Sequence, residues 1–146
     1  REYVIVNVSS RLENLPAIGG PARYGVTRSM LALADLIVLV AAPTPVGVAR
    51  VLDWLAEAQS LIEATPLHIA FNAFNGGGFK GAEIDTELRQ VYQPRSVAFV
   101  PHDKALAQAT WQGVLPGRGA FVKGIERLAT TANLPRRPAR GHRRAR

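Results

Sequence analysis

Residues 36–62, "LIVLVAAPTPVGVARVLDWLAEAQSLI", decide the fold class of this chain. The first seven are apolar with almost no polar alternation, which is typical of a strand covered on both faces. A threonine N-cap and a proline at the first helical position follow. From Pro45 to Ala64, apolar residues at intervals of three or four share one face, which predicts an amphipathic helix. A strand that leads directly into a helix is the repeating unit of an α/β sheet.

The same alternation of apolar runs and helical patterns continues along the rest of the chain. It predicts three further strands, at residues 3–8, 67–74 and 96–100, and four further helices, at residues 27–34, 82–92, 103–112 and 120–131. Strands that alternate with helices form parallel sheets with right-handed crossovers. We therefore expect an α/β fold, an open, mostly parallel sheet with flanking helices, in one domain that spans residues 1–133.

The composition fits a single domain of modest size. At 146 residues and 47% apolar content, the chain can bury one core. Its longest apolar stretch is about a dozen residues and is interrupted by Asp35, whereas a membrane span needs roughly 20. No cysteine is present, which fits a reducing compartment. We therefore expect a soluble, cytoplasmic protein.

The positive charge is concentrated at the C-terminus. The formal net charge is +7, and residues 134–146 hold six of the 18 Lys and Arg residues and no acid. The rest of the chain carries 12 basic and 11 acidic residues, a balance of +1. A segment of Pro, Gly and Arg cannot repay the entropy of ordering, so we predict a disordered basic tail. The tail is either a solvated terminus or a contact that places the protein on the nucleoid or a membrane. That contact would be non-specific, with DNA or anionic lipid, through Arg136, Arg137, Arg140, Arg143, Arg144 and Arg146.

Spacing excludes several familiar catalytic sites. The stretch "GGGFKG" at residues 76–81 lacks the Lys-Ser or Lys-Thr pair that completes a Walker A loop. His68, His102 and His142 are far apart and have no cysteine partners, so we expect no metal site. Ser9 lacks the surrounding glycines of a hydrolase elbow. The sequence also lacks the acidic cluster of a receiver-like phosphoacceptor domain.

Polar residues gather at the carboxyl ends of the predicted strands, which is where open α/β sheets bind ligands. Asn7 ends the first strand, "AAPTP" (41–45) ends the second, Asn72 lies in the third, and "VPHD" (100–103) ends the fourth. Asp103 is equally suited to be the N-cap of the helix that follows. The sequence thus predicts a binding edge, with a structural alternative at Asp103.

These strand ends, in this order, resemble the C-terminal part of a ParA/MinD-type P-loop ATPase of the MinD-like and CpaE-like branch. The resemblance covers about residues 2–132, and "YVIVNV" stands where the family has its Walker B strand. "TRSMLALADLIVLVAAPTPVGVARVLDWLAEA" resembles the helix and "AD" that lead into a strand, a proline and a long helix. "PLHIAFNAFN" corresponds to the strand ending in Asn, and "SVAFVPHDKALAQATWQG" to the late strand, its P-x-D turn and its helix.

The resemblance implies a P-loop NTPase-like fold and a role for each matching residue. Asn72 would read the edge of an adenine, since its amide offers both a donor and an acceptor. Tying loop backbones together is the structural alternative for this side chain. Pro101, His102 and Asp103 would flank the base on its other side. Residues 9–25 would be the switch II region, which responds to the γ-phosphate in this class.

Two departures from the family bear on activity. Asn7 stands at the position of the Walker B Asp, and a neutral amide holds the magnesium shell less well than a carboxylate. The Walker A loop, which precedes the Walker B strand in this family, is absent, and the start "REYVIV" lacks an initiator Met. We therefore expect a fragment whose complete parent uses ATP and Mg²⁺, whereas this chain alone is inactive and has no catalytic residue.

Two functions remain open. The first is the C-terminal portion of an ATPase that positions cargo, in DNA partition, septum placement or pilus and secretion assembly, and that forms a homodimer when complete. The second is a catalytically degenerate P-loop-like domain that acts as an interaction module for an unknown protein partner. The amide at Asn7 favours the second function.

Overall fold

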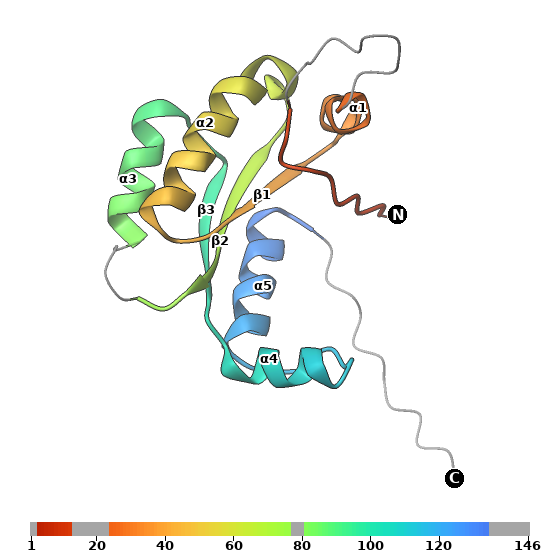
Figure 1. The fold of residues 1–146 in the computed structure, drawn as a ribbon, viewed down its shortest axis with the longest axis vertical. Helices are drawn as coiled ribbons and strands as arrows, with labels where there is room; N and C mark the ends of the chain where they lie inside the picture. The colour runs from red at the N-terminus through yellow and green to blue at the C-terminus, as the bar shows by residue number, and fades with distance from the viewer. Residues whose placement is uncertain (1–2, 13–23, 77–80, 135–146) are drawn as a thin grey trace.

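The structure is a computed structural model, which describes residues 3–12, 24–76 and 81–134. Five helices and three strands alternate along these residues (Figure 1). In chain order they are α1 (Gly25–Leu33), β1 (Ile37–Ala41), α2 (Pro45–Ile62), β2 (Leu67–Phe74), α3 (Gly81–Val91), β3 (Ser96–Pro101), α4 (Lys104–Trp111) and α5 (Ala120–Thr131). The five predicted helices and three of the four predicted strands are thereby confirmed, with ends that differ by no more than two residues.

The three strands form one parallel sheet in the order β1-β2-β3. Ile37 pairs with Leu67 at the start of β1, and Ala41 pairs with Phe71 at its end. The pairing of β2 with β3 is regular up to Phe71 and Phe99, then shifts before Phe74 meets Pro101. An open parallel sheet with flanking helices is the expected α/β fold class.

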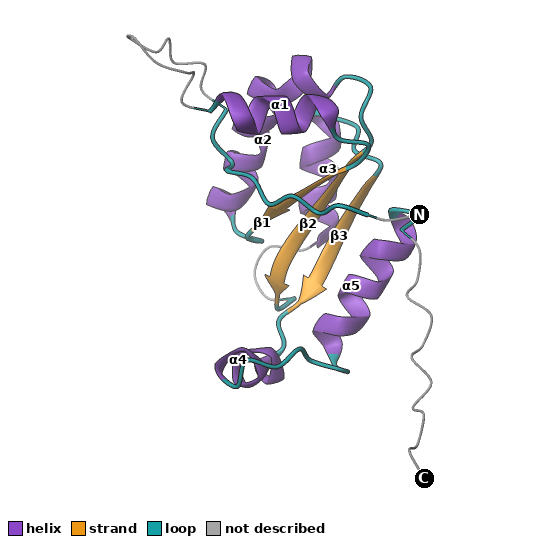
Figure 2. Cartoon of the chain, turned by 90° about the vertical axis from the view of Figure 1, so that its right-hand side faces the viewer, coloured by secondary structure: helices purple, strands orange, loops and turns teal. Residues whose placement is uncertain are grey.

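Helices cover both faces of the sheet. Figure 2 shows α2 and α3 on one face, whereas α5 lies on the other face beside β3. The close approach of α5 depends on Gly124, where a Cβ atom would lie 2.8 Å from Cδ of Pro101. On the opposite face, α2 begins with the predicted cap, since the Thr44 hydroxyl accepts a hydrogen bond of 3.0 Å from the Gly47 amide. Pro45 occupies the first turn, as expected.

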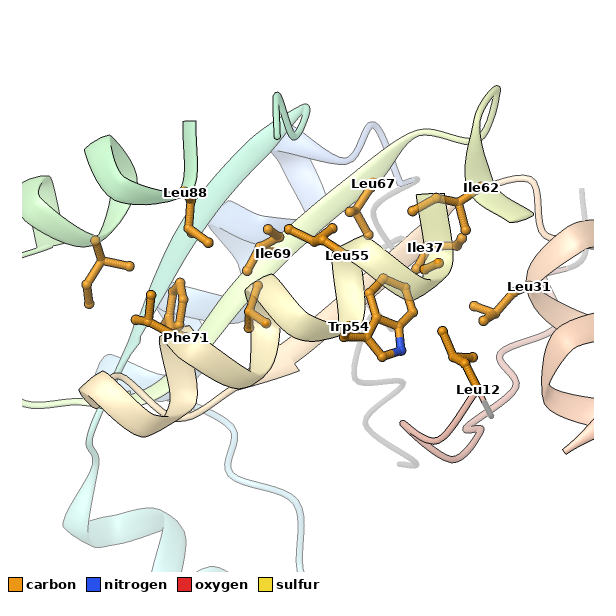
Figure 3. Close-up of a cluster of buried hydrophobic side chains, with 14 residues drawn as sticks. Leu12, Leu31, Ile37, Trp54, Leu55, Ile62, Leu67, Ile69, Phe71 and Leu88 are labelled. Carbon is orange, nitrogen blue, oxygen red and sulfur yellow. The ribbon is translucent and has the colours of Figure 1, made fainter. Parts of the chain in front are cut away.

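The hydrophobic core lies between β2 and the helices α2 and α3 (Figure 3). Apolar residues of β2 alternate onto this face, and Ile69 and Phe71 are fully buried there. Leu55 and Leu88 meet them from α2 and α3. The core extends to the N-terminal segment through one residue, Leu12, which is 1% exposed. Among the described helices, none has the length and apolar content that crossing a bilayer requires.

The predicted strand at residues 3–8 is wrong. These residues form no strand in the described structure, and they run as an extended segment on the α1 side of the sheet (Figure 1). Val4 and Ile5 are 87% and 93% exposed. An apolar, β-branched run has the propensity for a strand, but propensity forms one only where a neighbouring strand accepts its hydrogen bonds. The predicted basic tail lies outside the described residues, apart from Leu134.

Candidate functional site

The candidate site is the carboxyl edge formed by the ends of β2 and β3. Phe74 and Pro101 are register partners there, and the His102 amide donates a hydrogen bond of 2.9 Å to the Phe74 carbonyl. The sequence predicted Asn72, Pro101, His102 and Asp103 as binding residues. The structure brings their strand ends together, because adjacent parallel strands end at the same edge of a sheet.

Asn72 is exposed near the end of β2. Its Oδ1 accepts a hydrogen bond of 2.9 Å from the amide of Ala73. Ala73 has a φ of 61°, in the left-handed region that non-glycine residues seldom adopt. In this conformation Asn72 supports the backbone of the next residue, and its base-reading role stays a prediction.

Three phenylalanine rings near the ends of β2 and β3 contact one another, and we call them the phenylalanine cluster. The rings of Phe71 and Phe99 stack with their centroids 5.6 Å apart, and those of Phe74 and Phe99 are tilted at 4.9 Å. In a regular strand, positions 71 and 74 would face opposite sides. The register shift between them, together with the positive φ of Ala73, brings Phe74 to the same ring as Phe71. Local periodicity does not reveal such a bulge, so the sequence did not predict this cluster.

Both carboxylate oxygens of Asp103 accept structural hydrogen bonds. Its Oδ1 accepts from the Ala105 amide at 3.0 Å, which caps α4, and its Oδ2 accepts from the Phe121 amide at 3.1 Å, in the first turn of α5. These bonds, that to Phe121 foremost, lower the pKa of the Asp103 carboxyl. The predicted N-cap role is confirmed. A base bound through this side chain would share the carboxylate with both helix caps.

Close packing keeps the Asp103 carboxylate in place. A Cβ atom at Gly119 would collide with Oδ2 of Asp103, so only glycine fits at this approach. Gly119 also has a φ of 129°, which side-chain-bearing residues avoid. The start of α5 is therefore built around the carboxylate that the end of β3 supplies.

Asn7 does not join the carboxyl edge as part of a strand. It is exposed and belongs to the N-terminal segment, which in Figure 1 does not run alongside the lower ends of β2 and β3. The predicted switch region, residues 9–25, lies mostly outside the described residues. The glycine-rich stretch 76–81 is described only at Gly76 and Gly81. The expected roles of Asn7 and of the switch region toward a nucleotide remain predictions.

His68 and Ser96 form a partly buried polar pair that the sequence did not predict. His68 is 4% exposed, and its Nδ1 lies 2.8 Å from Oγ of Ser96 in the neighbouring strand. Burial is the main cause that lowers the pKa of His68, and the positive charge of Arg95 adds to it. The folded chain therefore favours the neutral form of His68, which joins two strands at the end of the sheet opposite the candidate site.

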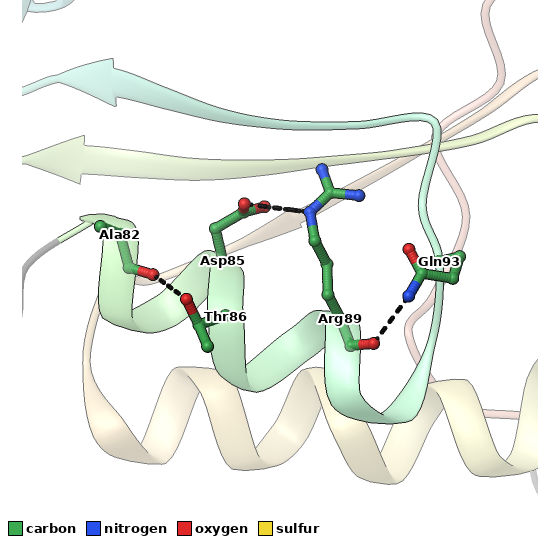
Figure 4. A network of polar contacts seen from close by, with 5 residues as sticks. All are labelled: Ala82, Asp85, Thr86, Arg89 and Gln93. Carbon is green, nitrogen blue, oxygen red and sulfur yellow. Dashed lines mark hydrogen bonds and ion pairs between the residues drawn. The ribbon is translucent and has the colours of Figure 1, made fainter.

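The acidic residues of α3 lie on a solvated surface rather than in a metal site. Figure 4 shows Asp85 paired with Arg89 one turn later, at 3.0 Å. On the same helix the Thr86 hydroxyl donates to the Ala82 carbonyl, and Gln93 donates to the carbonyl of Arg89. Within residues 3–12, 24–76 and 81–134, no group of three or more His, Asp or Glu side chains is arranged to hold a metal ion.

Comparison of the chain with protein-family models, with curated proteins and with solved structures finds no match. The resemblance to ParA/MinD-type ATPases therefore stays a prediction, which depends on the order of the motifs along the sequence. The parallel sheet and the meeting of its strand ends are what the structure contributes to any functional proposal.

Proposed function

We propose that this chain is the C-terminal portion of a ParA/MinD-like ATPase domain and supplies the base-binding side of its nucleotide site. The complete protein would dimerise, use ATP and Mg²⁺, and position cargo such as DNA, a division septum or a pilus or secretion apparatus. One observation carries the proposal: Asn72, Pro101 and His102 come from neighbouring parallel strands that end at the same edge. Open α/β sheets bind nucleotides at such edges.

Base recognition would use the amide of Asn72 and the backbone that follows β3. An asparagine amide presents a donor and an acceptor side by side, which matches the edge of adenine. Because Oδ1 already accepts one hydrogen bond from the Ala73 amide, recognition of the base would use its second lone pair together with the side-chain N–H. The phenylalanine cluster would limit how deeply a base could bind between the strand ends.

The experiment is a titration of the 146-residue chain with adenosine, followed by backbone amide shifts in nuclear magnetic resonance. We expect saturable shifts at Asn72 and His102 with adenosine, and weaker shifts with guanosine. Asn72→Asp replaces the donor with an acceptor, so it should abolish the preference for adenosine. Asn133→Gly, at the end of α5, is the matched control. Equal shifts with both nucleosides, or none, would contradict the proposal.

Turnover is a separate outcome. Since the sequence contains no Walker A loop and has Asn7 in place of the Walker B Asp, we expect the purified chain to release no phosphate from ATP with Mg²⁺. Measurable release that survives Asn7→Ala would show that this chain hydrolyses ATP by other means, and the proposed division of labour would then be wrong.

The second candidate function is an interaction module without nucleotide binding. Asp103 favours it, because each of its carboxylate oxygens already accepts a hydrogen bond from the start of a helix. The amide at Asn7, in an exposed segment that forms no strand, favours it as well. An absence of adenosine-specific shifts, in a chain whose circular dichroism confirms the fold, would select this function over the first.

A further inference from the structure

An exposed apolar group projects from the end of α4. Trp111, Val114 and Leu115 are 91%, 54% and 95% exposed, and we call these three residues the hairpin tip. Single exposed apolar residues are normal on a monomeric protein, whereas larger contiguous apolar patches mark surfaces that bind another molecule. The core needs none of the three, since none belongs to its buried cluster.

The hairpin tip has a defined conformation. The Val114 amide donates to the Ala109 carbonyl at 3.0 Å, and the Gly113 amide donates to Thr110 at 3.1 Å. Gly113 has a φ of 66°, so the helix ends in a Schellman turn, the arrangement that glycine at this position permits. The apolar residues are therefore presented by a fixed turn.

Helix α4, which carries the hairpin tip at its end, stands apart from the layered body of the molecule. Figures 1 and 2 both place α4 beyond the carboxyl ends of the strands, outside the layers that α2, α3 and α5 form with the sheet. Asp103 fixes its base by bonding the first turns of α4 and α5. The tip is thus a projection on a helix whose start is fixed by hydrogen bonds. Such a shape can insert into a concave surface or a lipid interface.

The stretch of chain that contains the hairpin tip is basic, apart from Asp103 at the start of α4. Between residues 104 and 125 the chain contains Lys104, Arg118 and Lys123 and no acidic residue, and these three side chains are exposed. The next acid, Glu126, lies on α5 beside Lys123 and Arg127, in a shallow surface hollow. A convex apolar tip with a basic surround is complementary to an interface that is anionic outside and apolar inside.

We propose that the hairpin tip inserts into the headgroup region of an anionic lipid bilayer. Trp111 lies at the headgroup level, where an indole can bury its ring and keep its N–H hydrated. Leu115 and Val114 reach the acyl boundary, and the three basic side chains contact lipid phosphates or carboxylates. This peripheral contact requires no spanning helix, and none of its residues belongs to the proposed nucleotide site.

The experiment is flotation of the full chain with vesicles made of equal parts phosphatidylcholine and phosphatidylserine. Leu115→Ser and Trp111→Ser should each weaken binding about tenfold, because each removes a large apolar side chain from the interface. The control is Leu33→Ser at the end of α1, where the leucine is 78% exposed but does not belong to the hairpin tip. It should leave the affinity unchanged. Lys104→Gln or Arg118→Gln should each weaken binding about fivefold.

A fluorescence readout separates insertion from simple charge attraction. The chain has two tryptophans, and Trp54 is only 8% exposed, so Trp111→Phe reports the signal of the buried one alone. We expect anionic vesicles to shift the emission of the wild-type chain to shorter wavelength, and brominated lipids to quench it. Neither effect should occur in Trp111→Phe.

Three results would overturn the proposal. Equal vesicle affinity of Leu115→Ser and wild type would assign the binding to the arginine-rich segment 134–146. Unchanged tryptophan emission on saturating vesicles would mean that the tip stays outside the bilayer. A sedimentation mass that falls on Leu115→Ser without lipid, with vesicle binding intact, would make the tip an interface with a second copy of the chain. Because the substituted side chains are exposed, circular dichroism should confirm that every variant folds.

Discussion

Asp103 and Phe121 are 18 positions apart, and a hydrogen bond of 3.1 Å joins the carboxylate of the first to the backbone amide of the second. The same carboxylate caps α4 through the Ala105 amide. One side chain at the end of β3 therefore satisfies the exposed amides at the start of two helices. The orientation of α4, and with it the position of the hairpin tip, depends on this residue.

Replacing Asp103 should destabilise the fold, and the loss should be larger for the substitution that removes both helix caps. Asp103→Asn keeps one carbonyl oxygen, so it can retain one of the two caps, whereas Asp103→Ala loses both. We expect the midpoint of thermal unfolding to fall by several degrees in the alanine variant and by less in the asparagine variant. Asp85→Ala, which removes an exposed ion pair on α3, is the control and should have little effect. Equal midpoints for all three variants would contradict the role of the carboxylate.

The helices and three of the strands could be predicted because the signals that specify them are local. The spacing of Val48, Val51 and Leu55 sets the buried face of α2, and Thr44 and Pro45 set its start. The failed strand at residues 3–8 has an equally strong local signal. Whether such a run forms a strand depends on an available edge elsewhere in the fold, and no pattern within the run contains that information.

The candidate site could be predicted in part, for a similar reason. Parallel strands end at one edge, so strand-terminal residues such as Asn72 and Pro101 can be placed together from the sequence. The second hydrogen bond of Asp103 could not, because it links β3 to a helix that begins 17 positions later at Ala120. The phenylalanine cluster depends on the bulge at Ala73, which local periodicity does not predict.

Enlarging Gly124 should separate α5 from β3. A Cβ atom there would lie 2.8 Å from Cδ of Pro101 and 3.3 Å from Cα of Val100, and neither the proline ring nor the backbone can give way cheaply. Gly124→Val should lower the free energy of unfolding by about 2 kcal/mol or more, measured by urea denaturation. Gly124→Ala should be milder, since the higher helix propensity of alanine offsets about 1 kcal/mol. Gly117→Val, at a position with no atom within 4 Å, is the matched control, and an equal loss there would exclude a packing cause.

Leu12 should anchor the N-terminal segment to the core. Its side chain is 1% exposed and belongs to the same buried cluster as Leu31 and Trp54 (Figure 3). Leu12→Ala should therefore cost about 2–5 kcal/mol of unfolding free energy, the range for buried leucines. Ile5→Ala removes an aliphatic side chain that is 93% exposed and should cost under about 0.5 kcal/mol. Similar losses in the two variants would mean that residues 3–12 are not held by Leu12.

The buried His68 should make stability depend on pH in a defined window. Burial, and then the charge of Arg95, lower its pKa in the folded chain, whereas in the unfolded chain it titrates near the ordinary value of about 6.5. As the pH falls below that value, the unfolded chain takes up a proton that the folded chain refuses. The stabilising contribution is therefore complete above about pH 6.5 and is lost as the pH falls toward the lowered pKa.

His68→Gln should remove this dependence, because glutamine can still bond Oγ of Ser96 but does not titrate. The measurement is the free energy of unfolding between about pH 5 and pH 7, above the range in which most carboxylates titrate. Wild type should lose stability across this window with a slope equivalent to at most one proton, while His68→Gln stays flat apart from a constant offset. His102→Gln changes an exposed histidine and should keep the wild-type slope. If the slope persisted in His68→Gln, the titrating group would have to lie elsewhere in the chain.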